Sequence, residues 1–137
     1  MPTLDTDVLV RFLVRDDVEQ YERAVGFIES AGHEADALYV PLTVALELER
    51  VLRSRYAVSK ESIIRTFVRL LETRELSFQD EPSVERALSL YGDHSTDFAD
   101  CLHLASAIGH GSSPMVTFDR KASRMAEAML LTASSDG

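Results

Sequence analysis

Short apolar runs alternate with longer segments of helical periodicity along this chain. The short runs are too brief for helices and are typical of buried strands, whereas the longer segments repeat apolar residues at intervals of three and four. Strands that alternate with helices are typical of an α/β fold, in which helices cover both faces of a parallel sheet. The predicted strands are Thr3–Leu4, Ala37–Leu42, "ELSF" (75–78), "PMVTFD" (114–119) and "MLLTA" (129–133).

Capping residues predict where several of the helices begin and end. Asp16, followed by Glu19, forms a capping-box pattern, and Gly32 suits the end of the same helix. Thr43 and Ser59 are the expected caps of the next two helices, the first of which runs to about residue 56. The remaining helical segments are expected at 8–14, from Pro82 to about Tyr91, within 93–111, and as a short helix within 120–128.

Length and composition predict one globular domain. The chain has 137 residues, of which 45% are hydrophobic and 27% are charged, and domains cluster near this size. Its single cysteine, Cys101, excludes an internal disulfide and fits a reducing compartment. The sequence shows no signal-peptide pattern and no run approaching the ~20 apolar residues that span a bilayer. We therefore expect one domain over 1–132, a flexible tail at 133–137 and a cytoplasmic location.

The net charge is distributed unevenly along the chain. The total is −9, but residues 50–74 contain seven Lys or Arg and two Glu, so this segment carries +5 and the remainder −14. A strongly acidic chain is unusual for a nucleic-acid binder, whereas a basic segment is typical of one. Two solvated helices, with arginines lying over apolar surface, are the alternative interpretation of the segment.

Acidic residues follow the predicted strands at one edge of the sheet. Asp5 and Asp119 each come at the end of a strand, Glu47 lies in the helix after 37–42, and Asp97 and Asp100 lie near the start of another helix. Ligands of α/β sheets bind at the carboxyl ends of the strands. Any one of these acids could instead cap a helix or complement its dipole. Because acids from four separate segments are expected at the same edge of the sheet, the sequence favours one shared binding site.

Clustered carboxylates repel one another, and a divalent cation removes that penalty. Oxygen ligands without His or Cys favour Mg²⁺ or Mn²⁺ over zinc, and neither His94 nor His103 has zinc-type spacing to another ligand. Such a metal activates water and neutralises the charge of a phosphoryl group. The sequence shows no Ser-His-Asp or Cys-His set and no phosphate-binding glycine loop.

Four motifs in this order resemble the PIN-domain ribonucleases, and specifically the VapC toxins of type II toxin–antitoxin pairs. The motifs are "LDTDVLVRFL", "VALELERVLRSRY", "DFADCLHLASA" and "VTFDRKA". The resemblance implies a three-layer α/β/α fold with a parallel sheet of about five strands. It further implies an Mg²⁺- or Mn²⁺-dependent endoribonuclease that cleaves cellular RNA, forms a homodimer and is inhibited by a cognate VapB-type antitoxin.

The resemblance also implies a role for each motif residue. Asp5, Glu47, Asp100 and Asp119 are the expected catalytic acids, with Asp5 and Asp100 as the main metal ligands. Glu47 would help hold the cluster and orient the attacking water, and Asp119 would complete the charge or serve a second metal. The expected supporting residues are Asp97 and Thr117, and the expected RNA-binding residues are Arg50, Arg53 and Arg55.

One residue departs from the family pattern, and two other functions fit parts of the sequence. Asp7 stands where the family commonly has Asn, and its role is open. A haloacid-dehalogenase-type phosphatase also begins with a strand and D-x-D, but it requires Thr or Val where this chain has Leu9. A PIN-like domain that only binds RNA or a partner is the second alternative.

Overall fold

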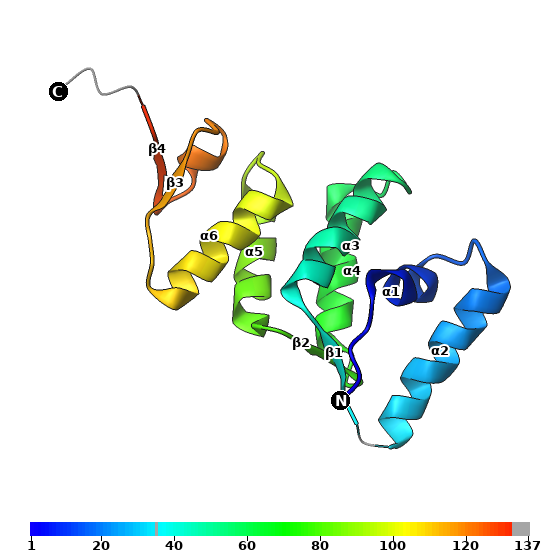
Figure 1. The fold of residues 1–137 in the computed structure, drawn as a ribbon. Helices are drawn as coiled ribbons and strands as arrows, with labels where there is room; N and C mark the ends of the chain where they lie inside the picture. The colour runs from blue at the N-terminus through cyan, green and yellow to red at the C-terminus, as the bar shows by residue number, and fades with distance from the viewer. Residues whose placement is uncertain (35, 133–137) are drawn as a thin grey trace. The chain divides into compact units, whose positions relative to one another are not determined.

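A computed structural model describes residues 1–34 and 36–132. The tail expected at 133–137 lies outside the described residues. The chain divides into two compact units, residues 1–81 and residues 82–137, and each unit is described by itself. Figure 1 gives the order of the helices and strands along the chain.

The first unit combines four helices with a pair of parallel strands. Leu38 pairs with Leu76 and Val40 with Phe78, and Thr3 forms an isolated parallel bridge to Tyr39 on the other side of the pair. The bridge lies where the first short strand was expected. The elements are α1 (Thr6–Leu13), α2 (Val18–His33), β1 (Leu38–Val40), α3 (Leu42–Ser54), α4 (Lys60–Glu72) and β2 (Leu76–Phe78).

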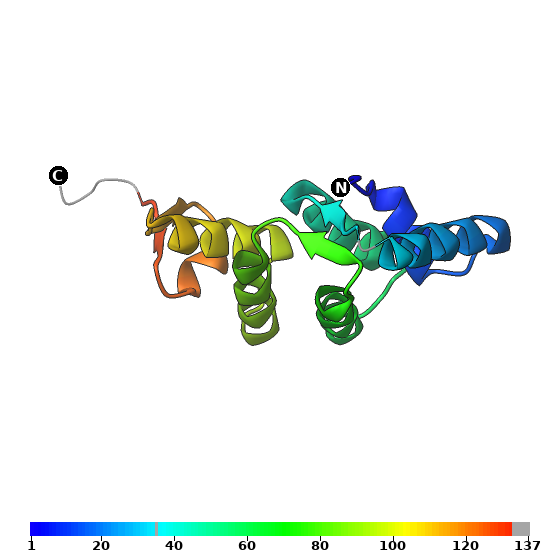
Figure 2. The same ribbon diagram turned by 90° about the horizontal axis from the view of Figure 1, so that it is seen from below.

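Helix α1 packs against both α2 and α3, and α4 packs against α3 and β2. Figure 2 shows α4 end-on beside the strand pair. The core of this unit is apolar and almost fully enclosed, and each fully buried Leu, Ile or Phe contributes about 1.5–3 kcal/mol relative to exposure. Its largest members are Leu9, Leu38, Leu48, Ile63, Phe67 and Leu70.

Three of the residues predicted to cap helices are wrong by one or two positions, and one is confirmed. Asp17, not Asp16, is the N-cap of α2 and accepts a hydrogen bond from the Gln20 backbone N–H. The same helix continues through Gly32 to His33. Helix α3 begins at Leu42, so its N-cap is Pro41 and not the predicted Thr43. Ser59 caps α4 as predicted, accepting from the Ser62 N–H.

The described part of the second unit contains two α-helices, a 3-10 helix and a second pair of parallel strands. Met115 pairs with Ala128 and Thr117 with Leu130. The rings of Tyr91 and Phe98 meet edge-on, with centroids 5.3 Å apart. The elements are α5 (Glu81–Asp93), α6 (Phe98–His110), β3 (Met115–Thr117), the 3-10 helix η1 (Ala122–Arg124) and β4 (Ala128–Leu130).

The predicted α/β class with parallel strands is confirmed, although the strands are short. Among the described residues, each unit contains one two-stranded parallel sheet, whereas the sequence predicted a sheet of about five strands. The helix expected within 120–128 is only the 3-10 turn η1. Within the described ranges, no helix is both long and apolar enough to cross a membrane.

Candidate active site

The first expected acid, Asp5, immediately precedes α1. It is the N-cap of this helix, and its Oδ1 accepts a 2.7 Å hydrogen bond from the Thr6 backbone N–H. Its side chain remains exposed, so the bond orients the carboxylate without removing it from solvent. Capping therefore accounts for part of the role of Asp5, and its exposure leaves it able to bind a ligand.

The second expected acid, Glu47, is held by the residue that follows Asp5. The buried Thr6 hydroxyl donates a 2.5 Å hydrogen bond to Glu47 Oε1. This bond connects α1 to α3 across 41 residues of sequence. Glu47 is exposed and lies 3.9 Å from the Arg50 guanidinium, an ion pair of i,i+3 spacing. Thr6 thus fixes one carboxylate through its backbone and the other through its side chain, a role that sequence analysis missed.

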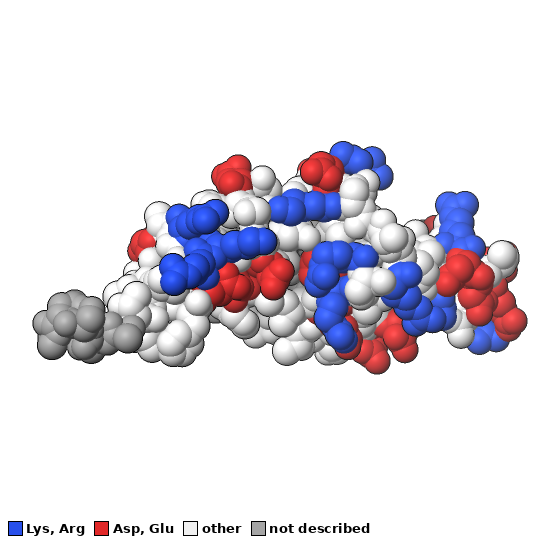
Figure 3. Space-filling view, turned by 90° about the horizontal axis from the view of Figure 1, so that it is seen from above, with Lys and Arg blue, Asp and Glu red and all other residues white. Residues whose placement is uncertain are grey.

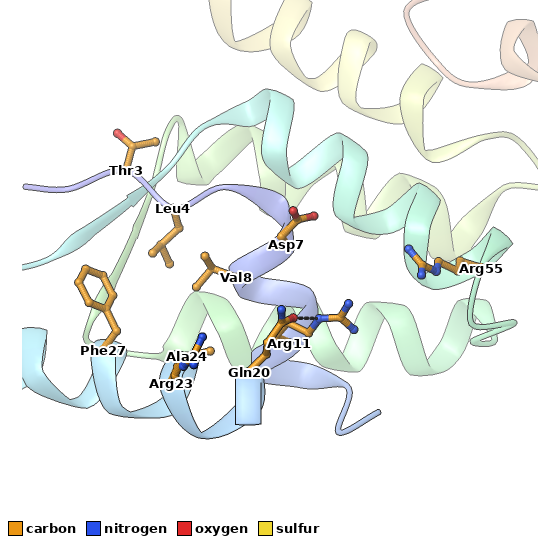
Figure 4. A pocket seen from close by; sticks show the side chains of 10 residues that line it. All are labelled: Thr3, Leu4, Asp7, Val8, Arg11, Gln20, Arg23, Ala24, Phe27 and Arg55. Atoms are coloured by element: carbon orange, nitrogen blue, oxygen red, sulfur yellow. Dashed lines mark hydrogen bonds between the residues drawn. The ribbon is translucent and has the colours of Figure 1, made fainter. Parts of the chain in front are cut away.

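Two hollows of the first unit adjoin these residues. A small one, of about 110 Å³, is lined by residues that include Asp7, Glu47 and Tyr56. A larger one, of about 650 Å³, lies along α1 and α2 and includes Phe27 (Figure 4). Asp7 lines both hollows, together with Arg11 and Arg55. The carboxylate that departs from the family pattern is therefore next to Glu47.

A polar network beside these hollows joins three segments of the first unit. Arg11 donates to Gln20 and, at 2.7 Å, to Asp16 Oδ1, and the Tyr56 hydroxyl donates to Asp16 Oδ2 at 3.0 Å. The Tyr56 hydroxyl, followed by the Arg11 guanidinium, lowers the pKa of Asp16, and Asp16 in turn raises the pKa of Arg11. This engagement explains why Asp16 does not cap α2.

The other three acids lie within the second unit. Asp97 is the N-cap of α6, Asp100 lies in the first turn, and Asp119 follows β3. Burial raises the pKa of the Asp100 carboxyl, and the negative charges of Asp119 and then Asp97 raise it further. His103 and Thr96 act in the opposite direction. The charges of Asp119 and Asp97 are thus close enough to disfavour the ionisation of Asp100.

Asp119 is oriented by its own turn. Its backbone N–H donates to Thr117 Oγ1 at 3.0 Å, and its Oδ1 accepts from the Ala122 N–H at 2.9 Å. Thr117 thus supports the backbone of Asp119, while η1 holds the carboxylate. The hydrogen bond from Ala122 is local, so the orientation of Asp119 follows from the conformation of the short segment after β3.

The residues after Asp119 add positive charge that sequence analysis did not consider. Arg120 and Lys121 line a hollow of about 360 Å³ together with Asp97, Asp119 and Thr96. In both units, basic side chains lie beside acidic ones on the face drawn in Figure 3. The signal was present in the sequence, because both residues directly follow Asp119 in "FDRK".

The three arginines expected to bind RNA occupy different environments. Arg50 pairs with Glu47, as described above. The Arg53 Nε donates to Glu49 Oε2 at 2.8 Å, and Glu49 is only 2% exposed. Arg55 lies over the ring of Tyr56, with its guanidinium carbon 5.7 Å from the centroid. Arg53 therefore has a structural partner in addition to any role toward a ligand.

The donor set of these acids fits a hard divalent cation. The sequence-predicted acids supply only carboxylate oxygens, which Mg²⁺ and Mn²⁺ prefer. Burial, followed by the negative charges of Asp119 and Asp97, disfavours the ionised form of Asp100, and a bound cation would offset that effect. In the part of the chain that the structure describes, however, no three His, Cys, Asp or Glu side chains are grouped so that they could hold a metal ion.

Comparison with known proteins identifies the family. The chain matches the PIN domain over residues 3–128 and belongs to the PIN domain family. A search of curated proteins finds no match to the chain. PIN domains have a three-layer α/β/α fold and are typically nucleases that use divalent metals such as Mg²⁺ or Mn²⁺.

Proposed function

We propose that this protein is a VapC-type toxin, a metal-dependent endoribonuclease that hydrolyses phosphodiester bonds of cellular RNA in the cytoplasm. In this proposal it acts as a homodimer and is neutralised by a cognate VapB-type antitoxin. The observation that carries the nuclease proposal is that Asp97 and Asp119 line one hollow of the second unit, while burial, followed by the charges of Asp119 and Asp97, raises the pKa of Asp100. The family match and the sequence motifs support the same conclusion.

The sequence motifs assign Asp5 and Asp100 as the residues that would hold Mg²⁺ or Mn²⁺, and Asp119 as the residue that would complete the negative charge. When bound, the ion supplies charge that acidifies water and neutralises phosphoryl oxygens. Glu47, held by Thr6, orients the attacking water and accepts its proton. Hydrolysis then places the elements of water across one P–O bond of the RNA, giving a phosphate at one end and a hydroxyl at the other.

Residues around the acids would orient them and bind the RNA. Asp97 and Thr117 support Asp100 and Asp119, the latter through the Thr117 hydrogen bond to the Asp119 backbone. Arg50, Arg53 and Arg55 would hold RNA phosphates beside the acids. A net charge of −9 repels RNA, so binding should depend on these cations and weaken with added salt.

The proposed function is tested in cells by expressing the wild type and Asp5→Asn and mapping the ends of cleaved RNA. Asn also caps helices well, so the variant should keep α1 and remove one ligand charge. We expect growth arrest and discrete new RNA ends with the wild type only. Equal arrest by both proteins, without new ends, would favour a PIN-like domain that binds RNA or a partner.

The toxin role has a separate test. A short reading frame beside the gene, encoding a DNA-binding N-terminal segment, is expected for a cognate antitoxin. Coexpression of its product should restore growth and form a stable complex with the wild-type protein. Failure of any neighbouring product to bind would contradict the toxin role and leave the nuclease activity intact.

A further inference from the structure

We propose that Asp16 is a positioning residue for Glu47. By binding Arg11 and Tyr56 together, it holds α1 against the end of α3, the helix that carries Glu47. The inference rests on the proposed nuclease function, in which Glu47 orients the attacking water. It gives a function to a polar network of the first unit that contains none of the candidate site residues.

Helices α1 and α3 are joined by polar contacts at two separate places. At the first, the buried Thr6 hydroxyl donates to Glu47 Oε1. At the second, more than a turn further along α1, Arg11 donates to Asp16 Oδ1 at 2.7 Å and the Tyr56 hydroxyl donates to Asp16 Oδ2 at 3.0 Å. Two helices joined at one point can pivot about it, whereas a second point fixes their relative orientation.

Tyr56 is attached closely to the end of α3. It directly follows Arg55, the C-cap of that helix, whose N–H donates to the Val51 carbonyl at 2.9 Å. The Arg55 guanidinium lies over the Tyr56 ring, and the Val58 N–H donates back to the Leu52 carbonyl at 3.0 Å. A hydrogen bond from the Tyr56 hydroxyl therefore also restrains the end of α3.

The connection between α1 and α2 holds Asp16 in place. On one side of it, the Arg15 guanidinium carbon lies 4.5 Å from the centroid of the Tyr21 ring. On the other side, Asp17 caps α2 by accepting from the Gln20 N–H at 3.0 Å. Because both neighbours are fixed to α2, Asp16 presents its carboxylate from a restrained backbone.

The space between α1 and α3 makes these polar contacts important. The small hollow of about 110 Å³ is lined by Thr6 and Glu47 from the first contact and by Arg11 and Tyr56 from the second. Helix α1 has only 8 residues, and so short a helix depends on tertiary contacts for its stability. Since this space is hollow rather than filled by side chains, the polar contacts beside it set how α1 lies on α3.

A positioning role differs from a purely structural one in what the loss of Asp16 changes. The Asp16 side chain is 42% exposed, and ion pairs at exposed positions contribute little to stability. A small misplacement of a catalytic group, in contrast, lowers a rate by up to about a hundredfold. Loss of the network should therefore reduce the rate of cleavage much more than the stability of the protein.

Tyr56→Phe tests the network by removing one hydroxyl while keeping the ring. With a short RNA in Mg²⁺, kcat should fall about fivefold to tenfold. KM should stay the same, because Glu47 acts on the water and not on RNA binding. Tyr21→Phe removes a hydroxyl outside the network and is the matched control, which should keep both values. A raised KM with unchanged kcat would contradict the proposal and show that the network binds RNA.

Variants of Asp16 test the carboxylate itself. Asp16→Ala removes both contacts and should lower kcat more than Tyr56→Phe does. Asp16→Asn keeps an acceptor oxygen and should recover part of the loss. Equal kcat values for Asp16→Ala and the wild type would overturn the proposal and leave the nuclease function intact.

The connection to Glu47 is tested by combining Tyr56→Phe with Thr6→Val. Residues that act through one network are not additive. The double variant should therefore lose little more kcat than Thr6→Val alone. A loss equal to the product of the two single losses would show that Tyr56 acts independently of Glu47, which contradicts the proposal.

Amide hydrogen exchange of α1 gives a result that does not depend on cleavage. Local opening of an element speeds the exchange of its N–H groups, so Tyr56→Phe should speed exchange in α1 and Tyr21→Phe should not. Unchanged exchange in Tyr56→Phe would contradict the positioning role whether or not the protein cleaves RNA. If the wild type cleaves no RNA, the nuclease function is wrong, and hydrogen exchange alone decides whether the network holds α1.

Discussion

The buried hydroxyl of Thr6 donates a hydrogen bond to the carboxylate of Glu47, 41 residues away in the sequence. The backbone N–H of the same threonine donates to Asp5. One residue at the start of α1 thus orients two of the proposed catalytic acids. Since hydrogen bonds to charged groups contribute about 1.5–3 kcal/mol, this link should affect both activity and stability.

Thr6→Val should lower RNA cleavage about tenfold or more, because Glu47 loses the donor that fixes its orientation. Because the Glu47 side chain is half exposed, the expected loss of stability is below that range, about 1 kcal/mol, measured by chemical denaturation. Thr6→Ser retains the hydroxyl and should recover most of the cleavage rate. A Thr6→Val protein with wild-type activity would show that the orientation of Glu47 is set elsewhere.

Asp100→Asn should abolish cleavage and stabilise the metal-free protein. The folded-state pKa of Asp100 lies above its ordinary value of 3.8. The folded state therefore holds the proton more tightly, and stability declines as pH rises from 3.8 through the folded-state pKa. At neutral pH the ionised group is destabilising, so its removal should raise the free energy of unfolding by up to about 1 kcal/mol.

Calorimetry with and without Mg²⁺ tests this electrostatic account of Asp100. Mg²⁺ should raise the melting temperature of the wild type and have little effect on Asp100→Asn. Asp93→Asn, exposed at the end of α5, is the control and should behave as the wild type in both conditions. An Asp100→Asn protein that melts below the wild type in the absence of metal would contradict the prediction.

The ionised form of Asp16 should stabilise the folded protein, whereas the ionised form of Asp100 destabilises it. Its folded-state pKa lies below the ordinary 3.8, because Tyr56 and Arg11 bind the ionised form. The stabilisation is complete well above pH 3.8 and disappears as pH falls through the folded-state pKa. The stability difference between wild type and Asp16→Asn, measured in urea at a series of pH values, should be constant near neutrality and shrink below pH 3.8. A difference that grows on acidification would refute this role.

Arg53→Met should destabilise the protein more than Arg50→Gln. The Arg53 guanidinium binds the buried Glu49 carboxylate, and weakening the pairing of a buried charge costs about 1–3 kcal/mol or more. The Arg50–Glu47 pair is exposed and 3.9 Å long, so its loss should cost less than about 1 kcal/mol. Urea denaturation measures both. Equal stabilities would contradict the structural role assigned to the Arg53–Glu49 pair.

Local sequence signals predicted most of the elements but not the contacts that set their ends. Ser59 caps α4 as expected, and its hydroxyl accepts from the Ser62 backbone N–H at 3.2 Å. Asp16 had the same local signal and does not cap, because Arg11 and Tyr56, from elements before and after it, bind its carboxylate. A capping pattern reports local preference, whereas the choice between Asp16 and Asp17 depends on tertiary partners.

The sequence indicated which acidic residues are candidates for the site, but not which residues hold or neighbour them. Asp97, Asp100 and Asp119 were grouped from their places after strands and at a helix start, and the charges of Asp119 and Asp97 do act on Asp100. Their catalytic role stays a prediction. Thr6 was missed because its partner Glu47 is distant in sequence. Arg120 and Lys121 were missed because two basic residues beside Asp119 are a weaker signal than the excess of basic residues at 50–74.

The most direct test of the central claim is cleavage of purified RNA by purified wild-type protein and by Asp5→Asn, with Mg²⁺ and with EDTA. Loss of one ligand carboxylate should reduce the rate of RNA hydrolysis at least about a hundredfold, comparable to removing a key electrostatic group from an active site. The proposed function predicts cleavage by the wild type in Mg²⁺ only. Cleavage that persists in EDTA, or that is equal for both proteins, would contradict it.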